Sequence, residues 1–229
     1  MFRLLTGFRL AADLRSTRYQ RAQAKSLKER RGLVSICVID DQPFAPKNNL
    51  EALGYNISLL GDPNSLDAVK DHHIVLCDLQ GVGRALGGEA QGAFLIRQIL
   101  ENYPEKYVVA FTGGGLNQTI TRDAMQASDA LLKKDADVET WMEKLDDVIR
   151  RLLDPYQVWL RQRKALVKKD VDTKTIIELE DTFVRSVAAD PKSGKDKFSS
   201  LVDSTKLSED ARSVVRSLVA SGLFHLLMK

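Results

Sequence analysis

The sequence predicts an α/β protein with a doubly wound, five-stranded parallel sheet and helical flanks. Short apolar, β-branched runs alternate with helix patterns five times over residues 34–153, which is typical of a parallel sheet covered on both faces. The preceding residues are strongly basic, and the following residues show helix patterns only. We therefore expect a basic amphipathic helix over 1–33, a sheet domain over 34–153 and an all-helical region over 154–229.

Strand and helix patterns follow one another regularly within the sheet domain. The expected strands cover residues 34–40, 55–60, 74–79, 107–112 and 129–133. The expected helices cover residues 47–53, 65–70, 93–102, 118–126 and 138–153. Glycine and proline separate the elements, because glycine ends a helix readily and proline interrupts it. We expect the flavodoxin-like strand order 2-1-3-4-5, in which ligands bind beyond the carboxyl ends of the strands.

The flanks differ from the sheet domain in charge. Lys/Arg and Asp/Glu number nine and two over residues 1–33, eleven and eighteen over 34–153, and fourteen and eleven over 154–229. A basic amphipathic helix can dock on protein, lie on an anionic membrane or bind nucleic acid. For residues 1–33 we expect protein docking, or packing on the acidic sheet domain, ahead of membrane and nucleic acid.

The C-terminal region predicts interaction rather than catalysis. Its expected helices cover residues 156–169, 173–189, 197–202 and 208–228, with a loop over 190–194. It contains no recognisable DNA-reading module and no enzymatic output motif. We expect protein binding or homo-oligomerisation, with DNA binding as a lesser alternative.

Composition excludes several classes of protein. Two cysteines cannot form a disulfide framework, and no Cys/His cluster has the spacing of a zinc site. No run approaches the roughly 20 apolar residues of a membrane span, and arginines interrupt the apolar residues at the N-terminus. We expect a cytoplasmic protein, with peripheral membrane contact through residues 1–33 left open.

Polar side chains stand where the expected strands end. Asp40 and Asp41 end the first strand, Asp78 the third, Thr112 the fourth and Lys133 the fifth. Three carboxylates held together repel one another unless a cation joins them. Mg²⁺ suits such a site, because it binds carboxylates together with waters and phosphate oxygens. With a lysine and a hydroxyl beside it, the pattern predicts a site for a phosphoryl group.

Each of these residues also has an ordinary interpretation. The acidic pair fits a helix N-cap followed by a surface acid, Lys133 fits a solvated strand end, and Thr112 fits a strand residue. The glycines that follow Thr112 lack the Gly-Lys-Ser/Thr ending of a phosphate-binding P-loop, so a turn is expected there.

The motifs VIDD (38–41), LCDL (76–79), FTG (111–113) and LLKK (131–134) stand in order, each at the end of an expected strand. Over residues 34–153, about half of the chain, the sequence resembles a response-regulator receiver domain of two-component signalling. The resemblance implies a phospho-acceptor whose partner is a histidine kinase or another phosphodonor. It implies no enzymatic activity beyond the domain's own phosphotransfer and dephosphorylation.

The resemblance also implies roles for individual residues. Asp40 and Asp41 would bind Mg²⁺ together with Asp78 and the backbone carbonyl of Gln80, and Asp78 would accept the phosphoryl group. Thr112 and Lys133 would bind the phosphoryl oxygens. The backbone amides of Leu79 and Gly113 would point at the same group.

Four departures from the family leave a second interpretation open. The run from Leu79 to Gly88 lacks the Met-Pro usual shortly after the acceptor, and the 81–92 loop is longer than usual. Ala130 replaces an aromatic residue, and Lys134 replaces a proline. The long loop is a candidate lid or partner-binding segment. We expect a phosphorylation-dependent switch of protein interaction or oligomerisation; the alternative is a pseudo-receiver that binds protein without phosphorylation. A phosphohydrolase with an aspartate nucleophile ranks lower, because Gln80 stands where it needs an acid.

Overall fold

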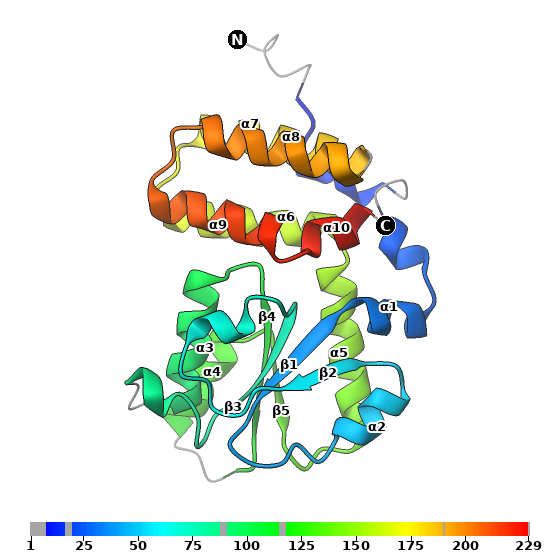
Figure 1. Cartoon of the computed structure of the whole chain (residues 1–229), viewed down its shortest axis with the longest axis vertical. Coiled ribbons are helices and arrows are strands. Elements are labelled where there is room, and N and C mark those ends of the chain that lie inside the picture. Colours follow the sequence, from blue (N-terminus) through cyan, green and yellow to red (C-terminus); the bar gives the residue numbers. More distant parts are fainter. Residues whose placement is uncertain (1–7, 17–19, 88–90, 115–117, 190, 229) are drawn as a thin grey trace. The chain divides into compact units, whose positions relative to one another are not determined.

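The computed structural model describes residues 8–16, 20–87, 91–114, 118–189 and 191–228 (Figure 1). The chain divides into two compact units. The sheet unit is Ser26–Arg150, and the helical unit combines Met1–Lys25 with Arg151–Lys229. The helical unit is therefore built from both ends of the chain, and the sheet unit is inserted between them.

Five parallel strands form the centre of the sheet unit. They are β1 Ser35–Ile39, β2 Asn56–Leu59, β3 Ile74–Asp78, β4 Tyr107–Thr112 and β5 Ala130–Lys133. Their order is β2-β1-β3-β4-β5, and every neighbouring pair is parallel. The predicted fold class and strand order are confirmed.

Helices cover both faces of this sheet. The helical elements of the unit are α1 Leu27–Leu33, α2 Lys47–Ala52, η5 Leu66–Val69, η6 Arg84–Leu86, α3 Gln91–Asn102, α4 Gln118–Ala127 and α5 Val138–Leu152. The elements η5 and η6 are short 3₁₀ segments, so the helix expected over 65–70 is a single tight turn. Figure 1 shows α3 and α4 on one side of the sheet and α2 and α5 on the other.

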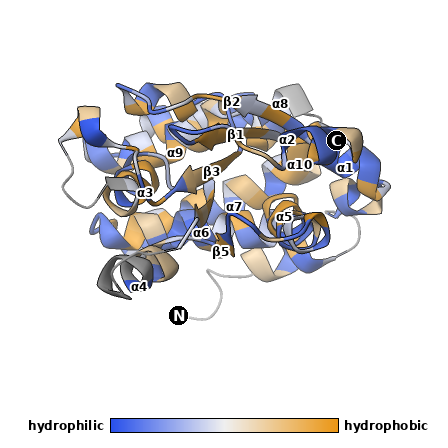
Figure 2. Cartoon of the chain, turned by 90° about the horizontal axis from the view of Figure 1, so that it is seen from below, coloured by the Kyte–Doolittle hydropathy of each residue, from blue (hydrophilic) through white to orange (hydrophobic). Residues whose placement is uncertain are grey.

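Strand residues alternate between two apolar layers. Cys37 and Cys77 belong to the cluster that includes Ile96 of α3. On the other face, the Phe44 and Phe111 rings lie 5.6 Å apart and both contact Trp141 of α5. Burial on both faces explains why the strands are continuously apolar, as the colours of β1 and β3 show in Figure 2.

In its described residues, the second unit contains helices and no strand. The helices are η2 Ala11–Arg15, η4 Arg21–Ala24, α6 Pro155–Lys168, α7 Thr173–Ala188, α8 Pro191–Ser204, α9 Glu209–Ala220 and α10 Leu223–Met228. Four aromatic rings from different helices meet in its core, with Phe183 contacting Trp159, Phe198 and Phe224 at 5.2–5.7 Å. None of the described helices has the length and apolar character needed to span a bilayer.

The single helix predicted over residues 1–33 is wrong. In the described part, the segment forms two 3₁₀ helices in the helical unit and α1 in the sheet unit; residues 1–7 and 17–19 lie outside the described residues. The amides of Arg9 and Ala11 donate to Asp181 and Glu180 of α7, each at 2.6 Å, instead of to a helix of their own. Ser26 then caps a new helix, because its hydroxyl accepts from the Glu29 amide at 3.3 Å.

Two predictions for the C-terminal helices are also wrong. A loop was expected over 190–194, but α8 begins at Pro191, since proline is suited to the first position of a helix. Residue 190 lies outside the described residues. The helix expected over 208–228 is divided into α9 and α10 at Gly222, whose φ of +73° is left-handed.

Candidate functional site

The ends of β1 and β3 bring the acidic residues together. Asp78 is the last residue of β3, and Asp40 directly follows β1, whose Ile39 is paired with Cys77. Asp40 and Asp78 are buried, whereas the neighbouring Asp41 is exposed. Carboxylate oxygens of all three residues lie within 4.8 Å of one another. The acidic cluster predicted from the sequence is therefore present in the geometry of the fold.

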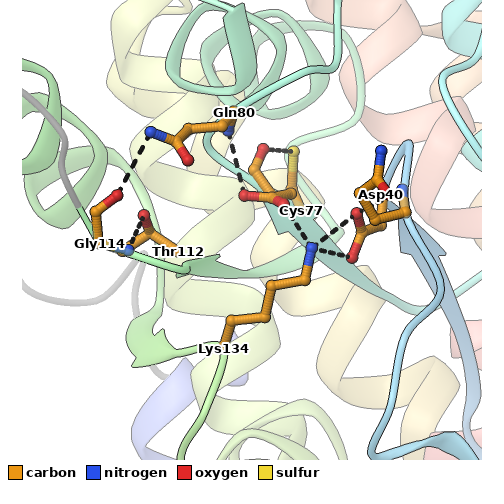
Figure 3. Close-up of polar contacts among 8 residues, drawn as sticks. Asp40, Cys77, Gln80, Thr112, Gly114 and Lys134 are labelled. Atoms are coloured by element: carbon orange, nitrogen blue, oxygen red, sulfur yellow. Dashed lines mark hydrogen bonds and ion pairs between the residues drawn. The ribbon is translucent and has the colours of Figure 1, made fainter.

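A lysine lies between the two buried carboxylates. Lys134 Nζ is 2.9 Å from Asp40 Oδ1, 2.8 Å from Asp40 Oδ2 and 3.0 Å from Asp78 Oδ2 (Figure 3). Burial lowers the pKa of Lys134, but the hydrogen bonds with Asp40 and Asp78 outweigh burial and raise the pKa above its ordinary value. The lysine is therefore a fixed cation against these two carboxylates.

This lysine is not the one that the sequence pattern indicated. Lys133 is exposed at the end of β5, where it is paired with Thr112. Successive side chains point to opposite faces of a strand, so Lys134 continues the face of Leu132, which is paired with Phe111. Lys134, and not the predicted Lys133, is therefore the lysine that contacts Asp40 and Asp78. The sequence-based expectation counted an aromatic residue three positions before the phosphoryl-binding lysine and a proline directly after it. Counted from Lys134, these two positions are Leu131 and Asp135.

Backbone amides hold both buried aspartates. The Gln42 amide donates to Asp40 Oδ1 at 2.9 Å, and the Gln80 amide donates to Asp78 Oδ1 at 3.1 Å. The expectation for Leu79 is wrong, because its amide donates to the Phe111 carbonyl at 3.0 Å as part of the sheet. The Gln80 amide was not among the expected donors; it forms an Asx turn with the Asp78 side chain two residues before it.

Thr112 stands at the same edge of the sheet. Its Oγ1 accepts from the Gly114 amide at 3.2 Å, and the Gly114 carbonyl accepts from Gln80 Nε2 at 3.4 Å (Figure 3). The turns after β3 and β4 are thereby connected beside Asp78. The roles of the Gly113 amide and the Gln80 carbonyl stay predictions, and residues 115–117 lie outside the described residues.

Two glycines that follow β3 are favoured by their surroundings, Gly81 mainly by its backbone conformation and Gly92 by close packing. A Cβ on Gly81 would overlap the Asp41 carboxylate, and the φ of Gly81, +75°, is left-handed. A Cβ on Gly92, in the first turn of α3, would overlap the carbonyl oxygen of Asp78. The sequence marked this region as glycine-rich without showing that two of its glycines pack directly against site residues.

The first half of the long 81–92 loop is anchored. Val82 is fully buried, and the Gly83 amide donates to Asp62 Oδ1 at 2.6 Å. Residues 88–90 of this loop lie outside the described residues. The proposed lid or partner-binding role of the loop therefore stays a prediction.

The donor set suits a hard divalent cation. Three carboxylates face one lysine, so negative charge remains after Lys134 is counted. Asp40 Oδ2 is buried and has no hydrogen-bond donor of good geometry, although Lys134 Nζ lies close to it. Oxygen ligands with surplus negative charge are those that Mg²⁺ prefers.

No protein-family model and no curated protein matches the chain. Solved structures do match. A response regulator receiver domain protein from Methanospirillum hungatei JF-1 is 17% identical, with a TM-score of 0.42, over 51% of this chain and 93% of that one. A response regulator from Thermotoga maritima is 22% identical, with a TM-score of 0.41, over 51% and 97%.

A third match is a response regulator from Burkholderia pseudomallei with a phosphorylated aspartic acid, calcium ion and citrate. It is 18% identical, with a TM-score of 0.41, over 74% of this chain and 92% of that one. TM-scores below 0.5 add no evidence about chemistry here. That evidence comes from Asp40, Asp78 and Lys134 themselves.

Proposed function

We propose that the sheet unit accepts a phosphoryl group on Asp78 and thereby switches protein interaction or self-association. One observation carries this proposal: Lys134 Nζ lies within 3.0 Å of both Asp40 and Asp78, beside a third carboxylate on Asp41. The sequence motifs that resemble a receiver domain support the same chemistry. The expected partner is a histidine kinase, or another phosphodonor, in the cytoplasm.

The chain's own residues prepare Asp78 for attack on phosphorus. The Gln80 amide fixes Oδ1 and Lys134 fixes Oδ2, so the carboxylate has one orientation. An Asp78 oxygen forms the new bond to phosphorus as the phosphorus–nitrogen bond of a phosphohistidine breaks, and the released imidazole takes up a proton. Lys134 and the Thr112 hydroxyl are suited to bind phosphoryl oxygens as charge develops on them.

Asp40, Asp41, Asp78 and the Gln80 carbonyl are the groups that would hold Mg²⁺. When bound, Mg²⁺ neutralises negative charge on the carboxylates and the phosphoryl oxygens. Without it, the surplus charge at this site opposes the approach of an anionic phosphodonor.

Labelling of the full chain by acetyl phosphate tests the proposal. With Mg²⁺, intact-mass spectrometry should show one added phosphoryl group in the wild type and none in Asp78→Asn. Asp71→Asn is the matched control, because the exposed Asp71 precedes the start of β3, whereas Asp78 is the last residue of that strand. If Asp78→Asn is labelled as well as the wild type, or the wild type is never labelled, phosphorylation of Asp78 is excluded.

One observation favours the alternative of a phosphorylation-independent binding module. Lys134 partly neutralises Asp40 and Asp78 through direct contacts, so the site has a cation of its own. Such a module predicts that Asp78→Ala binds its protein partner as tightly as the wild type does. Loss of partner binding on this substitution would count against it.

A further inference from the structure

Helix α6 is unusually cationic. Its 14 residues include Arg161, Arg163, Lys164 and Lys168 but no aspartate or glutamate. The neighbouring helices α7 and α9 carry residues of both signs. Like charges three or four positions apart destabilise a helix. Helix α6 therefore contains destabilising repulsion that acidic residues relieve in its neighbours. Such a departure from local stability is typical of a functional surface.

The cations share one exposed face with two apolar residues. The exposed residues of this face are Leu160, Arg163, Lys164, Val167 and Lys168, spaced as one side of a helix. Leu160 is 36% exposed and Val167 is 57% exposed. The opposite side of α6 packs into the core of the helical unit through Trp159 and Leu166.

Some exposed cations of the helical unit have acidic partners. Arg185 lies 2.9 Å from Asp181, and Arg216 lies 2.9 Å from Asp203. On the α6 face, Arg163 Nη1 lies 4.0 Å from Oε2 of the buried Glu180, which is a long ion pair. Within the described part of the chain, Lys164 and Lys168 form no ion pair. Their charge is therefore available to a partner.

We propose that this α6 face is a docking surface for an acidic amphipathic helix of a partner protein. Leu160 and Val167 are seven residues apart, with Arg163 and Lys164 between them on the same face. A helix with apolar residues at positions i and i+7 and carboxylates at i+3 and i+4 complements this order. The apolar residues would supply contact area, and the opposed charges would set the orientation.

The interleaved order favours a protein helix over two other anionic partners. A nucleic-acid backbone gives no apolar surface against Leu160 and Val167. Insertion into an anionic membrane needs an apolar stripe separated from its cations. On the exposed side of α6, only Leu160 and Val167 are apolar, and Arg163 and Lys164 flank them on either side, so the apolar surface is too small for insertion.

A synthetic helical peptide with the repeat Leu-x-x-Glu-Glu-x-x-Leu is the probe, and a scrambled peptide of the same composition is its control. Binding of each labelled peptide to the full chain is measured by fluorescence anisotropy at about 0.1 M salt, where screening is moderate. We expect the patterned peptide to bind at least about tenfold more tightly than the scrambled peptide.

Two variants assign the binding to α6. Lys164→Glu with Lys168→Glu should weaken it by about tenfold, because the charges then repel. Val167→Ser should weaken it by about threefold through lost apolar contact. The matched controls are Lys195→Glu with Lys206→Glu for charge and Leu27→Ser for apolar exposure. All three residues are exposed and none belongs to α6, so these substitutions should leave the affinity unchanged.

Three outcomes would overturn the proposal. Equal binding of patterned and scrambled peptides would exclude recognition of an amphipathic helix. An unchanged affinity in Val167→Ser would leave a purely electrostatic surface. Displacement of the peptide by a single-stranded oligonucleotide at lower concentration would assign the face to nucleic acid. Because α6 lies outside the phosphorylation site, Asp78→Asn should bind the patterned peptide like the wild type.

Discussion

Two partly buried ion-pair clusters of the sheet unit differ in their charge balance. In the first, the Arg31 cluster, Arg31 Nε and Nη2 contact the Asp146 carboxylate at 2.9 and 2.6 Å. Arg31 Nη1 also donates to the Leu53 carbonyl, and the Tyr55 hydroxyl donates to Asp146 at 2.8 Å. In the second, the Asp78 site, Lys134 contacts Asp40 and Asp78, and the exposed Asp41 carboxylate lies within 4.8 Å of these two.

The comparison separates a structural cluster from a functional one. In the Arg31 cluster one cation meets one anion in bidentate geometry; the hydrogen bond with Asp146 raises the pKa of Arg31 despite burial. It connects α1 to α5 and needs no further partner. The Asp78 site keeps negative charge that the protein itself does not neutralise. Such a surplus costs stability and is expected where a ligand supplies the missing charge.

Removing the cation of the Arg31 cluster should have the largest effect on the free energy of unfolding. Arg31→Ala leaves the Asp146 carboxylate without its cation and removes the guanidinium from the Tyr55 ring, 4.7 Å away. We expect a loss of about 3 kcal/mol in the free energy of unfolding, measured by urea denaturation. Arg150→Ala, which breaks an exposed pair with Asp147, should cost less than about 0.5 kcal/mol. Equal losses would remove the distinction between buried and exposed pairs.

Adding Mg²⁺ should stabilise only the unbalanced site. A ligand that binds the native state alone at one hundred times its Kd adds about 2.7 kcal/mol. We expect Mg²⁺ to raise the thermal midpoint of the sheet unit in the wild type and far less in Asp41→Asn. Asp71→Asn should respond like the wild type. A shift of the same size in Asp41→Asn would show that Mg²⁺ binds elsewhere.

The two adjacent lysines at the end of β5 should differ sharply. Lys134→Gln leaves Asp40 and Asp78 without their cation, which we expect to cost about 1–2 kcal/mol in urea denaturation. Exposed Lys133→Gln should be neutral to within about 0.5 kcal/mol. A larger loss for Lys133→Gln would reinstate the residue that the sequence pattern indicated.

The same lysine gives this difference a pH dependence. Its pKa is raised above the ordinary value of 10.5, so its contribution is complete below that value and is lost as the pH rises through the higher folded-state value. The gap between wild type and Lys134→Gln should therefore be constant near neutral pH and narrow only in alkaline solution.

The sequence predicted the sheet because its strands are unambiguous. Runs such as residues 107–111 are apolar throughout and are bounded by polar residues, so the strand positions followed from them. Adjacent lysines could not be told apart, because only the register of β5 against β4 decides which one faces Phe111. The expectation that the Leu79 amide points at the phosphoryl site was wrong for a similar reason. The pairing of β3 with β4 directs this amide to the Phe111 carbonyl.

The N-terminal segment shows a different limit of sequence reasoning. Its apolar spacing fitted one helix, but Leu14 is fully buried in the helical unit and Arg15 donates to Tyr156 of α6 at 2.7 Å. These contacts join residues far apart in the chain, and periodicity carries no information about them. Likewise, the need for glycine at Gly92 depends on what packs against it.

Replacing aspartate by asparagine should have opposite signs in the two clusters. Without metal, Asp78→Asn removes one of three crowded negative charges while its Oδ1 can still accept from the Gln80 amide. We expect a gain of about 1 kcal/mol in the free energy of unfolding, because repulsion falls by more than the lost ion pair contributes. Asp146→Asn instead leaves Arg31 without its anion, and we expect a loss of about 2 kcal/mol.

Urea denaturation in the presence of a chelator measures both substitutions under the same conditions. Asp203→Asn, at an exposed pair in the helical unit, is the control for the chemical change itself and should alter stability by less than about 0.5 kcal/mol. If Asp78→Asn destabilises the chain as Asp146→Asn does, Lys134 neutralises its site fully. The surplus charge would then no longer distinguish the Asp78 site from the Arg31 cluster.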